Sequence, residues 1–195
     1  MTVMTLLDRS VRDGLLAFAG DPANLGTRAI AGVLASSREG RIPAFEEGLG
    51  ARRFAALADR LFPGADPGQP TPSSSLFPTV EYGDLMRLLL DHRSRKGEET
   101  EMVAHAMAIA CLGANHLWED MHLDNRAELS ALIGAYFGAL AALNVRDMKW
   151  KNFFYKQICA REGFNACRAP RCEECCDQER CFGPEDGPGP GAGRP

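Results

Sequence analysis

The stretch Glu98-Glu-Thr-Glu-Met-Val-Ala-His-Ala-Met-Ala-Ile-Ala-Cys-Leu112 is the part of the sequence that decides the fold. It opens with glutamates, and negative charge suits the first turn of a helix. The residues that follow are apolar on nearly every face, apart from His105 and Cys111. A helix that is hydrophobic all round belongs in a protein interior. We therefore predict a helix over residues 98–112 at the centre of a bundle.

Helical patterns on both sides supply the elements that would pack around this helix. Apolar residues recur at three- and four-residue steps in the ranges 2–61, 80–91, 125–143 and 147–161. Within the first range we expect a break at Pro43 and a helix from Phe45 to Phe62. Asn125 is the expected cap of the clearest helix, over 125–143. Because no convincing stretch alternates with a two-residue period, the predicted fold is all-α, a helical bundle with a C-terminal cysteine-rich metal-cluster loop.

Composition divides the chain into three parts. Residues 1–161 carry the helical patterns, interrupted by a loop over 63–79 that is rich in proline, glycine and serine. Residues 162–183 hold most of the cysteines and are predicted to be an iron–sulfur cluster segment. Residues 184–195 are dominated by glycine and proline, a composition typical of a disordered tail.

Charge and hydropathy exclude several classes of function. The formal net charge of −4 argues against a nucleic-acid-binding protein, which needs a summed basic field. No run of about 18 or more apolar residues occurs, so a membrane span is not expected. Charged residues interrupt the N-terminal stretch before a signal-peptide core can form, which predicts a cytoplasmic protein.

Five of the seven cysteines lie within residues 167–181. Leaving out Cys176, the remaining four form a C-x4-C-x2-C-x5-C array made of Cys167, Cys172, Cys175 and Cys181. Two residues between the middle cysteines let one turn direct both sulfurs at the same metal or cluster. The array therefore predicts a metal site.

Three kinds of site remain open for this array. Four thiolates also suit structural zinc, which would make the chain a small regulatory or interaction protein. Zinc sites usually contain two short hooks separated by a longer gap, whereas these cysteines run continuously, as in cluster-binding loops. Disulfides are disfavoured by the odd cysteine count and by the absence of an export signal. The spacing favours an iron–sulfur cluster.

Basic residues surround the array in the sequence. They are Lys149, Lys151, Lys156, Arg161, Arg168, Arg171 and Arg180. Such cations lower the pKa of nearby thiols and attract an oxyanion such as molybdate. The alternative is a solvated helix face with ordinary basic side chains.

Two strings of sequence, followed by the cysteine array, closely resemble the NifQ family of nitrogen-fixation proteins. The first is Ile109-Ala-Cys-Leu-Gly-Ala-Asn-His-Leu-Trp-Glu-Asp120, and the second is Asp147-Met-Lys-Trp-Lys-Asn-Phe-Phe-Tyr-Lys-Gln-Ile-Cys159. The resemblance covers about residues 80 to 183. Two features depart from the family pattern. Met121-His122 stands where a Leu-Gly pair is expected, and Cys176 is an additional thiol.

The resemblance implies an iron–sulfur protein that acquires molybdenum and donates it for synthesis of the iron–molybdenum cofactor of nitrogenase. Its implied ligands are Cys167, Cys172, Cys175 and Cys181, holding a 3Fe-4S or 4Fe-4S cluster. Implied partners are the nitrogenase cofactor scaffold complex, the nitrogenase iron protein and a molybdate or molybdenum–sulfur species. We expect a metal carrier rather than an enzyme, because the chain lacks a nucleotide-binding fingerprint or a nucleophile and base set.

His105 and His116 are candidates for additional molybdenum ligands. They are eleven positions apart, so on one continuous helix they would face nearly the same direction. The alternative is a pair of hydrogen-bonded core histidines. The sequence leaves the roles of Cys111, Cys159 and Cys176 open.

Overall fold

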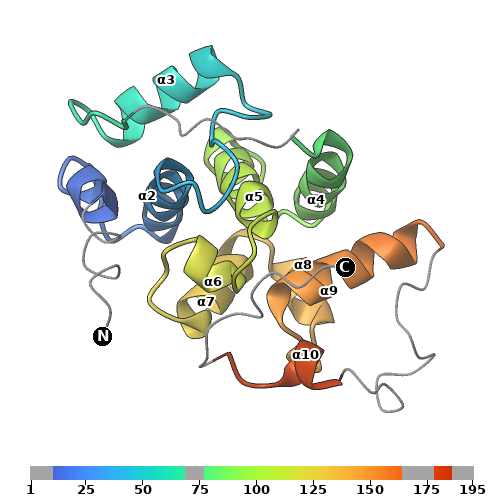
Figure 1. The fold of residues 1–195 in the computed structure, drawn as a ribbon. Helices are drawn as coiled ribbons and strands as arrows, with labels where there is room; N and C mark the ends of the chain where they lie inside the picture. Colours follow the sequence, from blue (N-terminus) through green and yellow to red (C-terminus); the bar gives the residue numbers. More distant parts are fainter. Residues whose placement is uncertain (1–10, 69–76, 164–177, 186–195) are drawn as a thin grey trace.

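The computed structural model describes residues 11–68, 77–163 and 178–185, and every regular element in these ranges is a helix (Figure 1). Residues 11–16 are helical. The helices that follow are α2 Leu25–Arg38, α3 Ala51–Leu61, α4 Thr79–Asp91, α5 Glu98–Cys111, α6 Leu117–Asp120, α7 Arg126–Tyr136, α8 Gly138–Leu143, α9 Trp150–Arg161 and α10 Gln178–Phe182. The all-α prediction is confirmed for the described residues.

Helix α5 forms the centre of the bundle, as its sequence predicts. Every residue from Met102 to Cys111 is buried. Helices α2 and α4 both contact α5, and Figure 1 shows it between them. Fully burying a side chain such as Met107 or Ile109 contributes about 1.5–3 kcal/mol relative to leaving it exposed. The glutamates of the first turn follow Gly97, the residue at the N-cap position.

The helix predicted over residues 125–143 is instead two helices, α7 and α8. Asn125 caps α7 as predicted, because its Oδ1 accepts a hydrogen bond from the Glu128 amide at 2.9 Å. The break lies at Phe137, with φ −136° and ψ 47°. Ser94 supplies hydrogen bonds to the backbone on both sides of this break. Its amide donates to the Tyr136 carbonyl at 2.8 Å, and its Oγ accepts from the Gly138 amide at 3.0 Å. A residue from another loop therefore replaces the helical hydrogen bonds at this point.

The helix predicted from Phe45 to Phe62 begins later, because α3 starts at Ala51. Gly48 and Gly50 have φ values of +72° and +84°, which lie outside the right-handed helical region. Phe45 is fully buried although it lies in the preceding loop, and its amide donates to Ser37 Oγ at 2.9 Å. The apolar pattern marked a buried aromatic residue here and not a helix.

No helix in the described ranges has the length and apolar character needed to cross a membrane. Parts of the predicted loop 63–79, of the cysteine-rich segment 162–183 and of the tail 184–195 lie outside the described residues. The division of the chain into these parts therefore stays a prediction.

Candidate functional site

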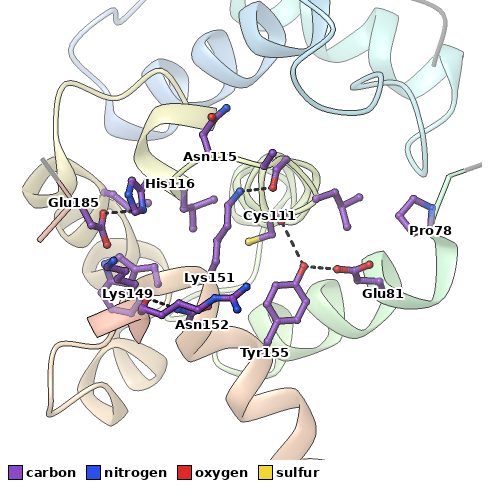
Figure 2. A pocket seen from close by; sticks show the side chains of 17 residues that line it. Pro78, Glu81, Cys111, Asn115, His116, Lys149, Lys151, Asn152, Tyr155 and Glu185 are labelled. Carbon is purple, nitrogen blue, oxygen red and sulfur yellow. Dashed lines mark hydrogen bonds and ion pairs between the residues drawn. The ribbon is translucent and has the colours of Figure 1, made fainter. Parts of the chain in front are cut away.

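A cavity of about 720 Å³ opens where the end of α5 and the turn to α6 face the start of α9 (Figure 2). Helix α10 and the residue Glu185 close one side of it. Its polar lining consists of Glu81, Cys111, Asn115, His116, Lys149, Lys151, Asn152, Tyr155, Arg180 and Glu185. The size is in the range of small-ligand sites.

A buried ion pair fixes the turn after α5 to α9. Asp120 is fully buried, and its Oδ2 accepts a hydrogen bond from Lys151 Nζ at 2.6 Å. Asn115 donates to the same carboxylate through its backbone amide at 3.2 Å and its side-chain amide at 2.9 Å. Lys151 Nζ also donates to the Gly113 carbonyl at 2.9 Å. With both partners hydrogen-bonded in this way, a buried charge pair is tolerated and holds one geometry.

Gly113 is required by the closeness of this turn to its neighbours. A Cβ atom at this position would lie 2.4 Å from Asp120 Oδ2 and 2.6 Å from Ile42 Cγ2. Contacts this short do not occur between real side chains, so any larger residue would displace the turn or the carboxylate.

The opposite end of the cavity is bounded by Tyr155 and Glu81. The Tyr155 hydroxyl donates to the Glu81 carboxylate and lies 3.4 Å from the Cys111 carbonyl oxygen. Burial raises the pKa of the Cys111 thiol to about 12, with Lys151 opposing this shift. Cys111 is therefore a neutral thiol at neutral pH and not a preformed thiolate ligand.

His116 lies on the cavity wall at the start of α6. Its Nδ1 is 3.9 Å from Glu185 Oε2, and Glu185 Oε1 is 3.7 Å from Arg126 Nε. The His116 amide donates to Glu119 Oε2 at 2.9 Å, which fixes the backbone at this point. Figure 2 shows the imidazole facing the Glu185 carboxylate.

His105 lies elsewhere, in the core. Its Nε2 donates to the Phe45 carbonyl at 2.7 Å, and its Nδ1 accepts from the Tyr82 hydroxyl at 2.8 Å. Burial lowers the pKa of His105 to about 4, so the ring is neutral at neutral pH. Because both nitrogens are engaged, the geometry matches the alternative of a hydrogen-bonded core histidine, and a role in molybdenum binding stays a prediction without support from this arrangement.

His105 and His116 do not lie on one continuous helix, so the shared direction that such a helix would give them is absent. Helix α5 ends at Cys111, and His116 precedes the separate short helix α6. The intervening turn places only His116 at the cavity.

Cys181 is the one predicted cluster ligand within the described residues, since Cys167, Cys172 and Cys175 lie outside them, as does Cys176. Cys181 is half-buried in α10 and is not in a disulfide. Its Sγ lies 3.8 Å from Asn152 Nδ2, and its carbonyl accepts from the Lys149 amide at 2.8 Å. Asn152 Nδ2 also donates to the Arg180 carbonyl at 3.0 Å. These bonds attach the end of the cysteine array to the start of α9.

The sequence predicted some of the residues at the cavity and missed others. Lys149, Lys151 and Arg180 were predicted from their charge, and they do meet at this cavity. The missed residues are Asn152, Asp120 and Glu185. Among the described residues, no group of three or more histidine, cysteine or acidic side chains has the geometry of a metal site.

A family model described as NifQ matches residues 29–183 of the chain. The chain belongs to the NifQ family of nitrogen-fixation proteins. The resemblance noted in the sequence is thereby confirmed, and it extends further toward the N-terminus than the motifs indicated.

Named relatives in the NifQ family come from several bacteria. Protein NifQ of Azotobacter vinelandii is 45% identical over 105 residues, which cover 54% of this chain and 54% of that protein. Protein NifQ of Rhodobacter capsulatus is 35% identical over 139 residues, covering 71% of this chain and 76% of that protein. The match to the first of these spans about half of the relative's length. No solved structure is similar to the chain.

The two sequence strings that carry the NifQ resemblance form facing walls of the cavity. Ile109–Asp120 contains the end of α5, the turn at Gly113 and helix α6. Asp147–Cys159 contains the start and middle of α9. The Asp120–Lys151 ion pair joins one string to the other. The two strings therefore build one site, and Cys181, the last cysteine of the array, is attached beside it.

Proposed function

We propose that this NifQ-family chain is an iron–sulfur molybdenum carrier that acquires molybdenum and donates it for biosynthesis of the nitrogenase iron–molybdenum cofactor. The observation that carries the proposal is the attachment of Cys181, the last cysteine of the array, to a cavity lined by lysine, asparagine and histidine side chains. One proposed cluster ligand thus lies beside groups that suit an incoming metal species.

The surroundings of Cys181 fit a ligand of a negatively charged cluster. Asn152 directs an amide donor toward the sulfur, and the Lys149 side chain lies nearby, bound to the Glu179 carbonyl at 3.5 Å. Hydrogen bonds and positive charge stabilise thiolate ligands and tune the cluster that they hold. We propose Cys167, Cys172, Cys175 and Cys181 as the ligands. A cluster held there would supply soft sulfide donors, which suit a thiophilic metal.

The helical domain would position the cargo beside these ligands. The Asp120–Lys151 pair keeps the α5–α6 turn against α9, which maintains the cavity next to Cys181. His116 offers an imidazole on the cavity wall as a further ligand for molybdenum. The chain is proposed to act as a carrier and not as an enzyme. Its proposed acceptors are the cofactor scaffold complex and the nitrogenase iron protein.

The decisive experiment is elemental analysis of protein purified without oxygen from cells supplied with molybdate. Iron, molybdenum, zinc and acid-labile sulfide are measured together, with low-temperature electron paramagnetic resonance of the same sample. Iron and sulfide with molybdenum support the carrier. Zinc with neither iron nor sulfide would contradict the carrier function and support the alternative, a regulatory or interaction protein with a structural zinc site.

The ligand assignment has its own matched test. Cys175→Ala should abolish iron retention and the visible charge-transfer absorption while the helical circular dichroism is kept. Cys159→Ala is the control, because Cys159 is a half-buried thiol on α9 outside the array. Equal iron loss in both variants would contradict the assignment.

A further inference from the structure

Two cations at the cavity have no carboxylate partner within the described parts of the chain. Among the described residues, the hydrogen-bond partner of Lys149 Nζ is the Glu179 carbonyl oxygen, at 3.5 Å. The Arg180 guanidinium lines the cavity and forms no ion pair with any of the described residues. Lys151, by contrast, is neutralised by Asp120. Two positive charges at this cavity therefore have no carboxylate partner among the described residues.

The other groups at this end of the cavity do not cancel that charge. Cys111 is a neutral thiol because burial raises its pKa. The Glu81 carboxylate is engaged by the Tyr155 hydroxyl at the far end. Asn152 Nδ2 donates to the Arg180 carbonyl at 3.0 Å and lies 3.8 Å from Cys181 Sγ, so it joins the cavity wall to α10. Lysine and arginine side chains of this kind are the groups that bind oxyanions in proteins.

Glu185 is a further carboxylate in the lining of this cavity. Its side chain is only 8% exposed, yet its contacts to His116 and Arg126 are 3.9 Å and 3.7 Å, longer than direct hydrogen bonds. It follows α10 directly, so it depends on the same short segment that carries Cys181 and Arg180. The Glu185 carboxylate therefore lies beside His116 and Arg126 without a direct hydrogen bond to either, in a position where an external anion could replace it.

We infer that this cavity binds a tetrahedral oxyanion through Lys149 and Arg180, and that the Glu185 carboxylate is an internal competitor which the oxyanion displaces from His116 and Arg126. The inference rests on the proposed function only where it names molybdate as the oxyanion. A cavity of about 720 Å³ holds such an ion with its hydration water. Asn152 lies on its wall and contacts Cys181, so a bound oxyanion would be held next to the proposed cluster ligand.

The test uses the full-length chain in a form that cannot hold a cluster, with all four array cysteines changed to serine. Binding of molybdate, tungstate, sulfate and phosphate is measured by isothermal titration calorimetry at low ionic strength, because salt screens such contacts. Lys149→Gln combined with Arg180→Gln should weaken molybdate binding by about tenfold or more, the equivalent of about 1.4 kcal/mol. Glu185→Gln should strengthen it by about threefold or more, since the competing charge is removed.

Matched variants separate the site from the net charge of the protein. Lys96→Gln removes an exposed positive charge in the loop between α4 and α5 and should leave binding unchanged. Glu162→Gln does the same for an exposed carboxylate at the end of α9. The inference is wrong if the cluster-free chain binds no oxyanion, or if Glu185→Gln has the same affinity as Glu162→Gln. Circular dichroism verifies that each variant is folded.

The outcomes distinguish this site from the proposed function. In one outcome, purified wild-type protein retains iron and molybdenum, but the cluster-free chain binds no oxyanion. This result would support the proposed carrier function and contradict the oxyanion site in the cavity. In another outcome, the protein carries zinc and no iron but still binds an oxyanion. This result would support the oxyanion site and contradict the carrier function. Sulfate or phosphate bound as tightly as molybdate supports an oxyanion site and removes its link to molybdenum.

Discussion

His105 and His116 are eleven positions apart, yet they lie in opposite chemical environments. His105 is enclosed by α5 and its neighbours and uses both ring nitrogens within the core. His116 lies past the end of α5, on the wall of a cavity that also holds lysine and arginine side chains. The difference arises at Gly113, where the chain turns out of the core toward Asp120. Availability for chemistry is therefore decided by where the helix ends and not by residue type.

The largest effect should come from removing the ion pair that holds this turn. Asp120→Ala leaves Lys151 without its carboxylate in a mostly covered position, and the Asn115 donors lose their acceptor as well. We expect a loss of about 3 kcal/mol in the free energy of unfolding, measured by urea denaturation. Asp91→Ala is the control, because its ion pair with Arg161 is exposed and should be worth less than about 1 kcal/mol. Equal losses in both variants would contradict the structural role given to Asp120.

The core histidine should make stability depend on pH. The folded-state pKa of His105 is lowered to about 4, below its ordinary value of 6.5, because burial disfavours the charged ring. The unfolded chain thus binds this proton first, and the stabilisation is lost as the pH falls from about 6.5 toward about 4. Between about pH 7 and about pH 5 the expected loss is about 2 kcal/mol.

The measurement for His105 compares urea unfolding of the wild type and of His105→Gln at both pH values. The variant should be less stable at neutral pH and should lose less stability on acidification. His116→Gln is the matched control at the cavity, and it should keep the pH dependence of the wild type. If His105→Gln retained the full pH dependence, the loss would have to come from other groups.

Two glycine-to-alanine substitutions, one at the turn after α5 and one within α7, should change the free energy of unfolding in opposite directions. Gly113→Ala places a methyl group where Asp120 and Ile42 already lie, so we expect destabilisation by about 1–3 kcal/mol. Gly134→Ala, within α7, meets no atom within 4 Å and should stabilise by about 0.5–1 kcal/mol through helix propensity. Thermal unfolding of both variants decides this. A stabilising Gly113→Ala would show that the turn is looser than the structure has it.

The central helix could be predicted from the sequence because burial on all sides leaves a local pattern, a run over residues 102–111 that is apolar apart from His105. The break at Phe137 could not, because it depends on Ser94, which lies in another loop. The same distinction applies to the site. Lys149, Lys151 and Arg180 were found from their charge close to the cysteines, whereas Asp120 acquires its role from a partner thirty-one positions away. Local patterns determine helices, and long-range contacts determine which polar residues meet.

A third histidine, His122, gives the smallest and most specific test of how turns decide histidine roles. It lies in the left-handed region with φ +48°, at the position where the family resemblance leads us to expect glycine. Its Nε2 is 3.1 Å from both Glu39 Oε2 and Arg41 Nη1, so it links the turn after α6 to the end of α2.

His122→Gly exchanges these contacts for relief of backbone strain, and we expect a net change within about 1 kcal/mol in the free energy of unfolding. His122→Ala loses the contacts and keeps the strain, so it should be less stable than His122→Gly by about 1 kcal/mol in urea denaturation. Equal stability of the two variants would mean that the left-handed conformation carries no strain, and that the glycine expected here has no conformational reason.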